Sequence, residues 1–188
     1  MPTFISLGLA VLLFSGTALA DSFDDAIAKF RAADGTQTFF SQAYGYAVFP
    51  TVGKGGIGIG GAYGKGRVYE AGAYTGDTSM AQLTIGFQLG GQAYSQIVFF
   101  QDKAAHDKFT SGNFEFGAEA SAVAITLGAQ AKAGTTGASA GGNEAISGEA
   151  AAATGWTVGM AIFTLAKGGL MYEASIGGQK FNYKRVSS

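Results

Sequence analysis

A run of closely spaced glycines, GGIGIGGAYGKG from Gly55 to Gly66, constrains the fold of this chain more than any other feature. Glycine has no Cβ atom, so a strand rich in glycine lets another backbone or an aromatic ring approach closely. The residues after the run, Arg67-Val68-Tyr69, are again typical of a strand. The run therefore favours tightly apposed strands of a sheet.

The same run invites a nucleotide-binding interpretation, which its spacing does not support. A Walker-type phosphate loop needs Ser or Thr after Gly64-Lys65, but Gly66 stands there, and Ile59 occupies the place of the first glycine. A dinucleotide fingerprint needs a glycine turn that opens a helix, whereas strand-like residues follow here.

Composition narrows the class of protein further. The 188 residues include 31 glycines, yet 47% are hydrophobic, with 15 Phe and 8 Tyr, which is too apolar for a disordered linker. With 12 basic and 13 acidic residues the chain has no strong global field, so DNA and RNA are not expected partners. It has no cysteine, which excludes disulfides and thiolate metal sites.

The first 20 residues are typical of a secretory signal peptide. An apolar stretch from Phe4 to Phe14 is followed by small residues ending at Ala20, although no Lys or Arg precedes it. A retained membrane anchor is the alternative, but the stretch is short for a span of ~20 residues. We therefore expect an exported protein, periplasmic or associated with the outer membrane, in which residues 1–20 are the signal peptide and residues 21–188 form one domain.

Two helices are predicted. Ser22 to Ala33 places Phe23, Ile27 and Phe30 at intervals of four and three, which is typical of an amphipathic helix. We favour docking of this face on a sheet over attachment to a membrane surface, for which the helix offers only Lys29 and Arg31 as head-group contacts. The second, short helix is expected within Gln101–Thr110, capped by Asp102 and ended near Gly112.

From Tyr44 onward the chain reads as short extended segments separated by glycines. The clearest is Gln82–Leu89, which alternates with Leu83, Ile85, Phe87 and Leu89 on one face and is interpreted as half-buried. Lys132–Thr154 has almost no large side chain and is interpreted as a long loop. Other predicted strands are Tyr46–Phe49, Ile57–Ala62, Arg67–Tyr74, Ala93–Phe100, Phe114–Leu127, Trp156–Leu165 and Leu170–Ile176. The fold class is therefore α+β, with a mainly antiparallel sheet.

Residues that could carry catalysis are few. The one histidine, His106, stands beside Asp107 and Lys108 in the short helix and is interpreted as a surface residue. A metal would need carboxylates alone, and Glu115 with Glu119 is an insufficient pair. The sequence contains no motif, such as GxSxG, that presents a catalytic nucleophile. We expect no enzymatic activity, no cofactor and no metal.

Several motifs resemble those of the SYLF family, also called Ysc84-like or DUF500. The segment Tyr46-Ala47-Val48-Phe49-Pro50, followed by Val52, Lys54 and the glycine run to Gly66, resembles the opening signature of that family. Further matching segments are Gly86–Gln92, Lys167–Leu170 and Ser175–Gln179. The tryptophan and proline usual between the second and third conserved blocks of the family are absent from Thr75–Ala81.

The resemblance implies association with lipid or with the cell envelope, because eukaryotic members bind phosphoinositide membranes. Some fungal members associate with actin, which is implausible for a chain with a bacterial-type signal. Lys54, Lys65 and Arg67, next to the glycine run, become candidate head-group contacts, with Lys29 and Arg31 in the helix. No protein partner is identified.

Two other functions are kept as alternatives. A small outer-membrane β-barrel is suggested by the signal peptide and the many short strands, but the chain ends in Lys184-Arg185-Val186-Ser187-Ser188, where a terminal aromatic is customary. A carrier of hydrophobic ligands would enclose a pocket lined by Phe87, Phe99 and Phe163.

Overall fold

The computed structural model describes residues 17–57, 59–85, 92–117, 124–127, 156–167 and 178–187. Within them the helices are α1 (Thr17–Ala32), α2 (Gln37–Gln42) and α3 (Lys103–Phe109). The strands are β1 (Gly45–Ile57), β2 (Ile59–Glu70), β3 (Ala73–Ile85), β4 (Gln92–Phe100), β5 (Asn113–Glu115), β6 (Ala124–Leu127), β7 (Met160–Ala166) and β8 (Gln179–Arg185).

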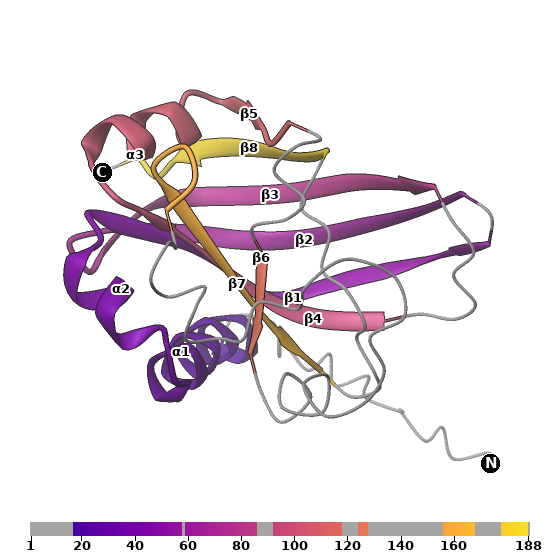
Figure 1. Ribbon diagram of the computed structural model, residues 1–188, viewed down its shortest axis with the longest axis horizontal. Coiled ribbons are helices and arrows are strands. Elements are labelled where there is room, and N and C mark those ends of the chain that lie inside the picture. Colours follow the sequence, from indigo (N-terminus) through magenta and orange to yellow (C-terminus); the bar gives the residue numbers. More distant parts are fainter. Residues whose placement is uncertain are drawn as a thin grey trace, which may run out of the picture.

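All of these strands belong to one sheet in the order β5-β8-β3-β2-β1-β4-β7-β6. Every neighbouring pair is antiparallel except β6 and β7, which run parallel. The helices lie at one end of the sheet, and the β1–β2 connection lies at the other end (Figure 1). The prediction of an α+β fold dominated by antiparallel sheet is confirmed.

The glycine run forms the hairpin of β1 and β2, with Ile57 opposite Ile59. The predicted single strand Ile57–Ala62 is therefore wrong, because the chain reverses inside it. The predicted strand Arg67–Tyr74 is wrong for the same reason. Ala71 and Gly72 have φ values of 48° and 83°, and two successive positive φ values make the tight turn that joins twisted antiparallel strands.

Hydrophobic side chains fill both faces of the sheet. On one face, called here the α1 face, Phe23 and Phe30 of α1 and Phe39 of α2 pack with Val48, Tyr69, Ile97 and Phe99. On the other, the α3 face, Phe109 of α3 packs with Phe49, Phe100, Phe114 and Phe181. Burial of Phe23 and Phe30 confirms that α1 docks by its phenylalanine face, although α1 begins at Thr17 and not at Ser22.

The Phe49-Pro50 pair marks a bulge in β1. The register of β1 slips against both of its neighbours between Val48 and Val52, which suits proline because it has no N–H to give to the ladder. The bulge turns Phe49 toward the α3 face and leaves Thr51 exposed. A Cβ atom added at Gly66 would lie 2.6 Å from two ring carbons of Phe49, so the glycine run makes room for this ring.

Polar residues inside the α3 face show how strongly the sheet curves. The amides of Gln96 in β4 and Gln179 in β8 exchange hydrogen bonds of 2.9 and 3.2 Å. Three strands separate β4 from β8 in the sheet, so this contact spans the concave interior. Both side chains are fully buried.

Three predictions about individual elements are corrected. Phe114–Leu127 is not one strand, because the extended segment β5 ends at Glu115, and β5 and β6 lie at opposite edges of the sheet. The strand predicted from Trp156 begins only at Met160, after a turn in which Gly159 has a φ of 76°. In β3, Leu83 is exposed and Gln82 is buried, because Gln82 lies on the α3 face opposite Gln179.

The short middle helix is confirmed, with the carboxylate of Asp102 accepting a 2.8 Å hydrogen bond from the Ala105 amide. His106 is not a surface residue, since it is 7% exposed and lies between the rings of Tyr44 and Phe100. The predicted loop Lys132–Thr154 and strand Leu170–Ile176 lie outside the described residues. Of the helices in the described residues, none is both long and apolar enough to cross a bilayer.

Candidate functional site: a cationic groove on the α1 face

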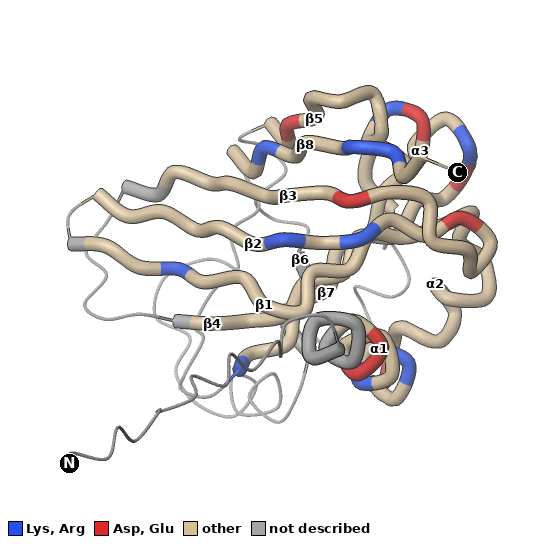
Figure 2. Tube along the Cα trace, turned by 180° about the vertical axis from the view of Figure 1, so that it is seen from behind, with Lys and Arg blue, Asp and Glu red and all other residues tan. Residues whose placement is uncertain are grey.

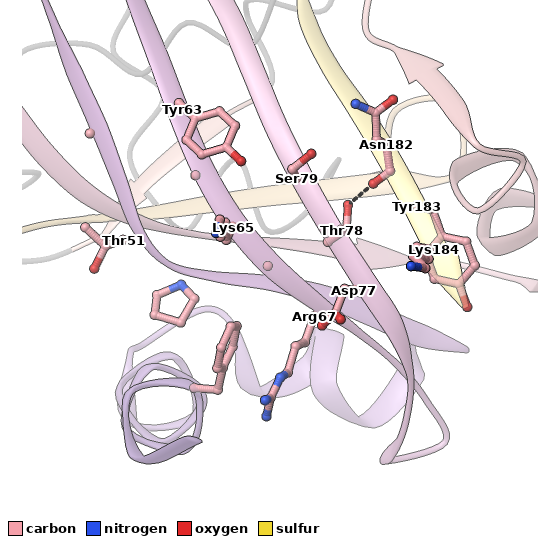
Figure 3. Close-up of a pocket in the computed structure, with 15 residues that line it drawn as sticks. Thr51, Tyr63, Lys65, Arg67, Asp77, Thr78, Ser79, Asn182, Tyr183 and Lys184 are labelled. Atoms are coloured by element: carbon pink, nitrogen blue, oxygen red, sulfur yellow. Dashed lines mark hydrogen bonds between the residues drawn. The ribbon is translucent and has the colours of Figure 1, made fainter. Parts of the chain in front are cut away.

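A groove of about 730 Å³ opens on the α1 face, between the start of α1 and strands β1, β2, β3 and β8 (Figure 3). Volumes of this order are typical of small-molecule sites. Apolar walls come from Phe23, Pro50 and Tyr63. The polar residues that line it on the α1 face are Thr51, Lys65, Arg67, Asp77, Ser79, Asn182 and Lys184. Thr78 and Tyr183 also border the groove, but their side chains belong to the α3 face.

Strand periodicity brings the cations of β2 into the groove. Lys65 and Arg67 are two residues apart, so they project from the same face of β2. Antiparallel register then sets Ser79 and Asn182 in a row with Lys65. The next row contains Asp77 and Lys184 beside Arg67.

Basic side chains outnumber acidic ones on this part of the sheet. Lys65 and Arg67 of β2 and Lys180 and Lys184 of β8 share the α1 face, and Asp77 of β3 is the acidic residue among them. Figure 2 shows basic positions in blue along β2 and β8 and an acidic position in red on β3. Glu115 of β5 lies 3.5 Å from Lys180. The groove therefore has an excess of positive charge and is suited to an anion.

Arg67 joins the groove to helix α1. Its guanidinium carbon lies 4.4 Å from the ring centroid of Phe23 and 4.9 Å from that of Tyr74. Both are cation–π contacts, which stabilise by about 0.5–1 kcal/mol each at exposed positions. Arg67 consequently supports the docking of α1 as well as the charge of the groove.

Asp77 is held by its neighbour. Its carboxylate accepts a 2.6 Å hydrogen bond from the hydroxyl of Tyr74. Burial, followed by this hydrogen bond, raises the pKa of Tyr74 to about 12, so the phenol stays protonated and continues to donate at neutral pH. The hydroxyl of Tyr74 therefore holds the side chain of Asp77 in place between Arg67 and Lys184.

The structure brings together only some of the predicted head-group contacts. Lys65 and Arg67 lie side by side in the groove, whereas Lys54 points to the α3 face with its cross-strand partner Ala62. Arg31, in the last turn of α1, lies 4.3 Å from the ring centroid of Phe40. Lys29 is exposed on α1.

Lys167 adds a cation beside the groove that the sequence did not indicate. Its ammonium donates a 2.8 Å hydrogen bond to the hydroxyl of Thr51, a groove residue. Burial, and then repulsion from Lys29, lowers the pKa of Lys167. Lys29 thus lies close enough to Lys167 for the two charges to interact.

Sequence reasoning also missed Ser79, Asn182 and Lys184. The alternation of Lys180, Asn182 and Lys184 signals an exposed strand face, but only the β3–β8 register places that face beside Lys65. No grouping of three or more His, Cys, Asp or Glu side chains within the described residues could hold a metal ion.

Two of the three residues predicted to line a hydrophobic-ligand pocket lie in the packed core. Phe99 and Phe163 pack against each other, at 5.8 Å between ring centroids, and each contacts Phe39 in the α1-face core. Phe87 lies outside the described residues. The groove is lined by other residues.

The fold and the groove define an α+β protein built on one curved sheet, with a cationic surface groove beside its first helix. The chain belongs to the Ysc84 family, described as "Las17-binding protein actin regulator", whose profile matches residues 81–184. The opening signature between Tyr46 and Gly66 precedes that range. Family members are thus named as regulatory or binding factors.

A second comparison gives a bacterial relative. Beta cell expansion factor A of Aeromonas veronii is 26% identical over 167 residues, which cover 82% of this chain and 51% of the relative. The chain therefore spans about half the length of that protein.

Proposed function

We propose that the protein is a non-enzymatic lipid-binding protein of the cell envelope, which associates with anionic membrane surfaces through the groove on the α1 face. We place it in the periplasm or at the outer membrane, in keeping with the expected signal peptide. Binding requires no chemical step, so the residues of the groove serve only to attract and hold a head group.

One observation carries this proposal: Lys65 and Arg67 project together into an open groove that hydroxyl and amide side chains also line. A lipid phosphate accepts hydrogen bonds from all of these groups. Each basic residue near an anionic membrane contributes about 1 kcal/mol. Exposed charges are screened by salt, so binding through this groove must weaken as ionic strength rises.

The test is cosedimentation of the full chain, purified without detergent, with vesicles of phosphatidylcholine alone or mixed with phosphatidylglycerol. We expect binding to the anionic vesicles only, and loss of that binding at high salt. Lys65→Ala combined with Arg67→Gln should weaken partitioning by roughly 30-fold, from the loss of about 2 kcal/mol.

The single variants Lys65→Ala and Lys54→Ala form a matched pair, because Lys54 lies in the same hairpin but on the α3 face. Each removes one positive charge, and Lys54→Ala should leave vesicle binding unchanged. A loss of binding equal to that of Lys65→Ala would show that total charge, and not the groove, governs attraction.

Asp77→Asn provides a test in the opposite direction. Removing the negative charge beside Arg67 should strengthen binding to anionic vesicles several-fold, since asparagine keeps an acceptor for the hydroxyl of Tyr74. Protein that ignores every vesicle would overturn the proposal and direct attention to a protein partner of the groove.

A further inference from the structure

Three large apolar side chains stand exposed at the end of the sheet farthest from the helices. Ile59 is 69% exposed, Tyr63 is 53% exposed and Leu83 is 75% exposed. All three lie on the α1 face, because Ile59 and Tyr63 share the outer face of β2 and Leu83 is paired with Gly61 between them. A cluster of this kind is costly in water, and it calls for an apolar environment.

Among the described residues, glycines explain why no neighbouring strand side chain covers these three. The residues of β1 opposite Gly61 and Tyr63 are Gly55 and Gly53, and Ala81 is opposite Tyr63 in β3. Gly61 itself lies at the centre of the cluster, and diagonal neighbours on a sheet stand within reach of long side chains. The strand residues around these three side chains are therefore glycine or alanine, which cannot cover them. We call Ile59, Tyr63 and Leu83 the apolar tip.

The apolar tip continues directly into the groove. Lys65 is the next outward residue of β2 after Tyr63, and Lys180 lies in the same row as Tyr63 and Ala81. At about 3.4 Å per residue, Ile59 lies about 20 Å from Lys65 along the strand and Tyr63 about 7 Å. The face thus passes from aliphatic to aromatic to cationic along one strand.

This order matches the depth profile of an anionic bilayer. Aliphatic side chains partition into the hydrocarbon, tyrosine prefers the interface, and lysine meets phosphate. We infer that the apolar tip inserts into the acyl layer of an anionic membrane while the groove holds head groups, so that the β1–β2 hairpin enters the membrane end-on. The inference rests on the proposed function and adds the orientation of the bound protein.

The absence of native cysteine permits a direct test. Single variants Ile59→Cys and Leu83→Cys carry an environment-sensitive fluorophore at the apolar tip. Ser79→Cys reports from the groove and Val186→Cys from an exposed residue at the C-terminal end. With phosphatidylglycerol-containing vesicles, emission at residues 59 and 83 should rise several-fold, shift to the blue and be quenched by nitroxides on the acyl chains, whereas residue 186 should not respond.

A second measurement uses Ile59→Ser combined with Leu83→Ser. Both side chains are exposed, so the variant should keep the circular dichroism and melting temperature of the unaltered chain. Its partitioning into anionic vesicles should be at least tenfold weaker, because it lacks the two aliphatic side chains that insertion would bury in the acyl layer.

The outcomes separate the two proposals. Salt-sensitive vesicle binding without any fluorescence change at residues 59 and 83 would overturn insertion and leave head-group binding intact. A complete absence of vesicle binding would overturn both head-group binding and insertion. A fluorescence change that follows protein concentration in the absence of vesicles would show that the apolar tip joins two copies of the chain, and would also overturn insertion.

Discussion

Gln96 and Gln179 donate hydrogen bonds to each other's amide oxygens across the concave face of the sheet, at 2.9 and 3.2 Å. Replacing one partner leaves a buried amide unsatisfied, which costs about 1–3 kcal/mol. We therefore expect Gln96→Leu to lower the free energy of unfolding by that amount in urea denaturation. The double variant Gln96→Leu with Gln179→Leu removes both amides and should cost less than the two single changes added together. Additive losses would show that the pair does not couple β4 to β8.

Gly66 is predicted to tolerate no side chain. A Cβ atom there would overlap the ring of Phe49, and such overpacking typically costs about 1–3 kcal/mol. Gly66→Ala should lower the urea midpoint, and Gly53→Ala is the matched control, since a Cβ atom at Gly53 would meet nothing within 4 Å. Equal midpoints for the two variants would mean that Phe49 moves aside without cost.

His106 is predicted to be replaceable by phenylalanine. Its Nε2 atom is buried without a hydrogen-bond partner among the described residues, and the rings of Tyr44 and Phe100 flank it with centroids 5.5 and 5.6 Å away. His106→Phe removes a buried polar atom and should leave the melting temperature unchanged or higher. His106→Ala loses packing and should lower the free energy of unfolding by at least about 1 kcal/mol. A strongly destabilised phenylalanine variant would show that Nε2 has a partner in solution.

Stability is predicted to fall at alkaline pH because of Tyr94. Burial raises the pKa of this phenol to about 12 from 10.0, so the folded protein keeps a proton that the unfolded chain releases. The contribution is therefore fully present below about pH 10 and is lost as pH rises toward 12, with a total on the order of 2–3 kcal/mol. Tyr94→Phe should lack this loss, measured as the difference in unfolding free energy between the two proteins at several pH values. A constant difference across that range would contradict the prediction.

Local patterns predicted the elements that local physics controls. The spacing of Phe23 and Phe30 indicated which face of α1 docks, and Asp102 indicated where α3 begins. The turn at Ala71 and Gly72 was missed because alanine seldom takes a positive φ, so the pair lacks the Asn-Gly or Asp-Gly pattern that usually marks such a hairpin. The exposure of Leu83 was missed because alternation shows only that the two faces of a strand differ. Leu83 lies on the α1 face, but α1 does not extend along the sheet far enough to cover it.

The composition of the groove was predictable only in part, for the same reason. The spacing of Lys65 and Arg67 along β2 predicts that they share a face, but the sequence does not show that Lys54 lies on the opposite face, because that depends on the bulge in β1 and on the pairing with Ala62. Asn182 meets Ser79 only through the β3–β8 register. That pairing joins residues more than 100 positions apart, and no local pattern encodes it.

The sheet order also determines what the protein offers to other strands. Its three longest strands, β1, β2 and β3, with 13, 12 and 13 residues, have a hydrogen-bonded neighbour on each side. The two edges are formed by β5 and β6, which have only three and four residues. Edge strands expose unpaired backbone groups with which another chain can pair. In the described part of the chain, the glycine-rich strands β1 and β2 therefore lie inside the sheet, where both of their edges are already paired.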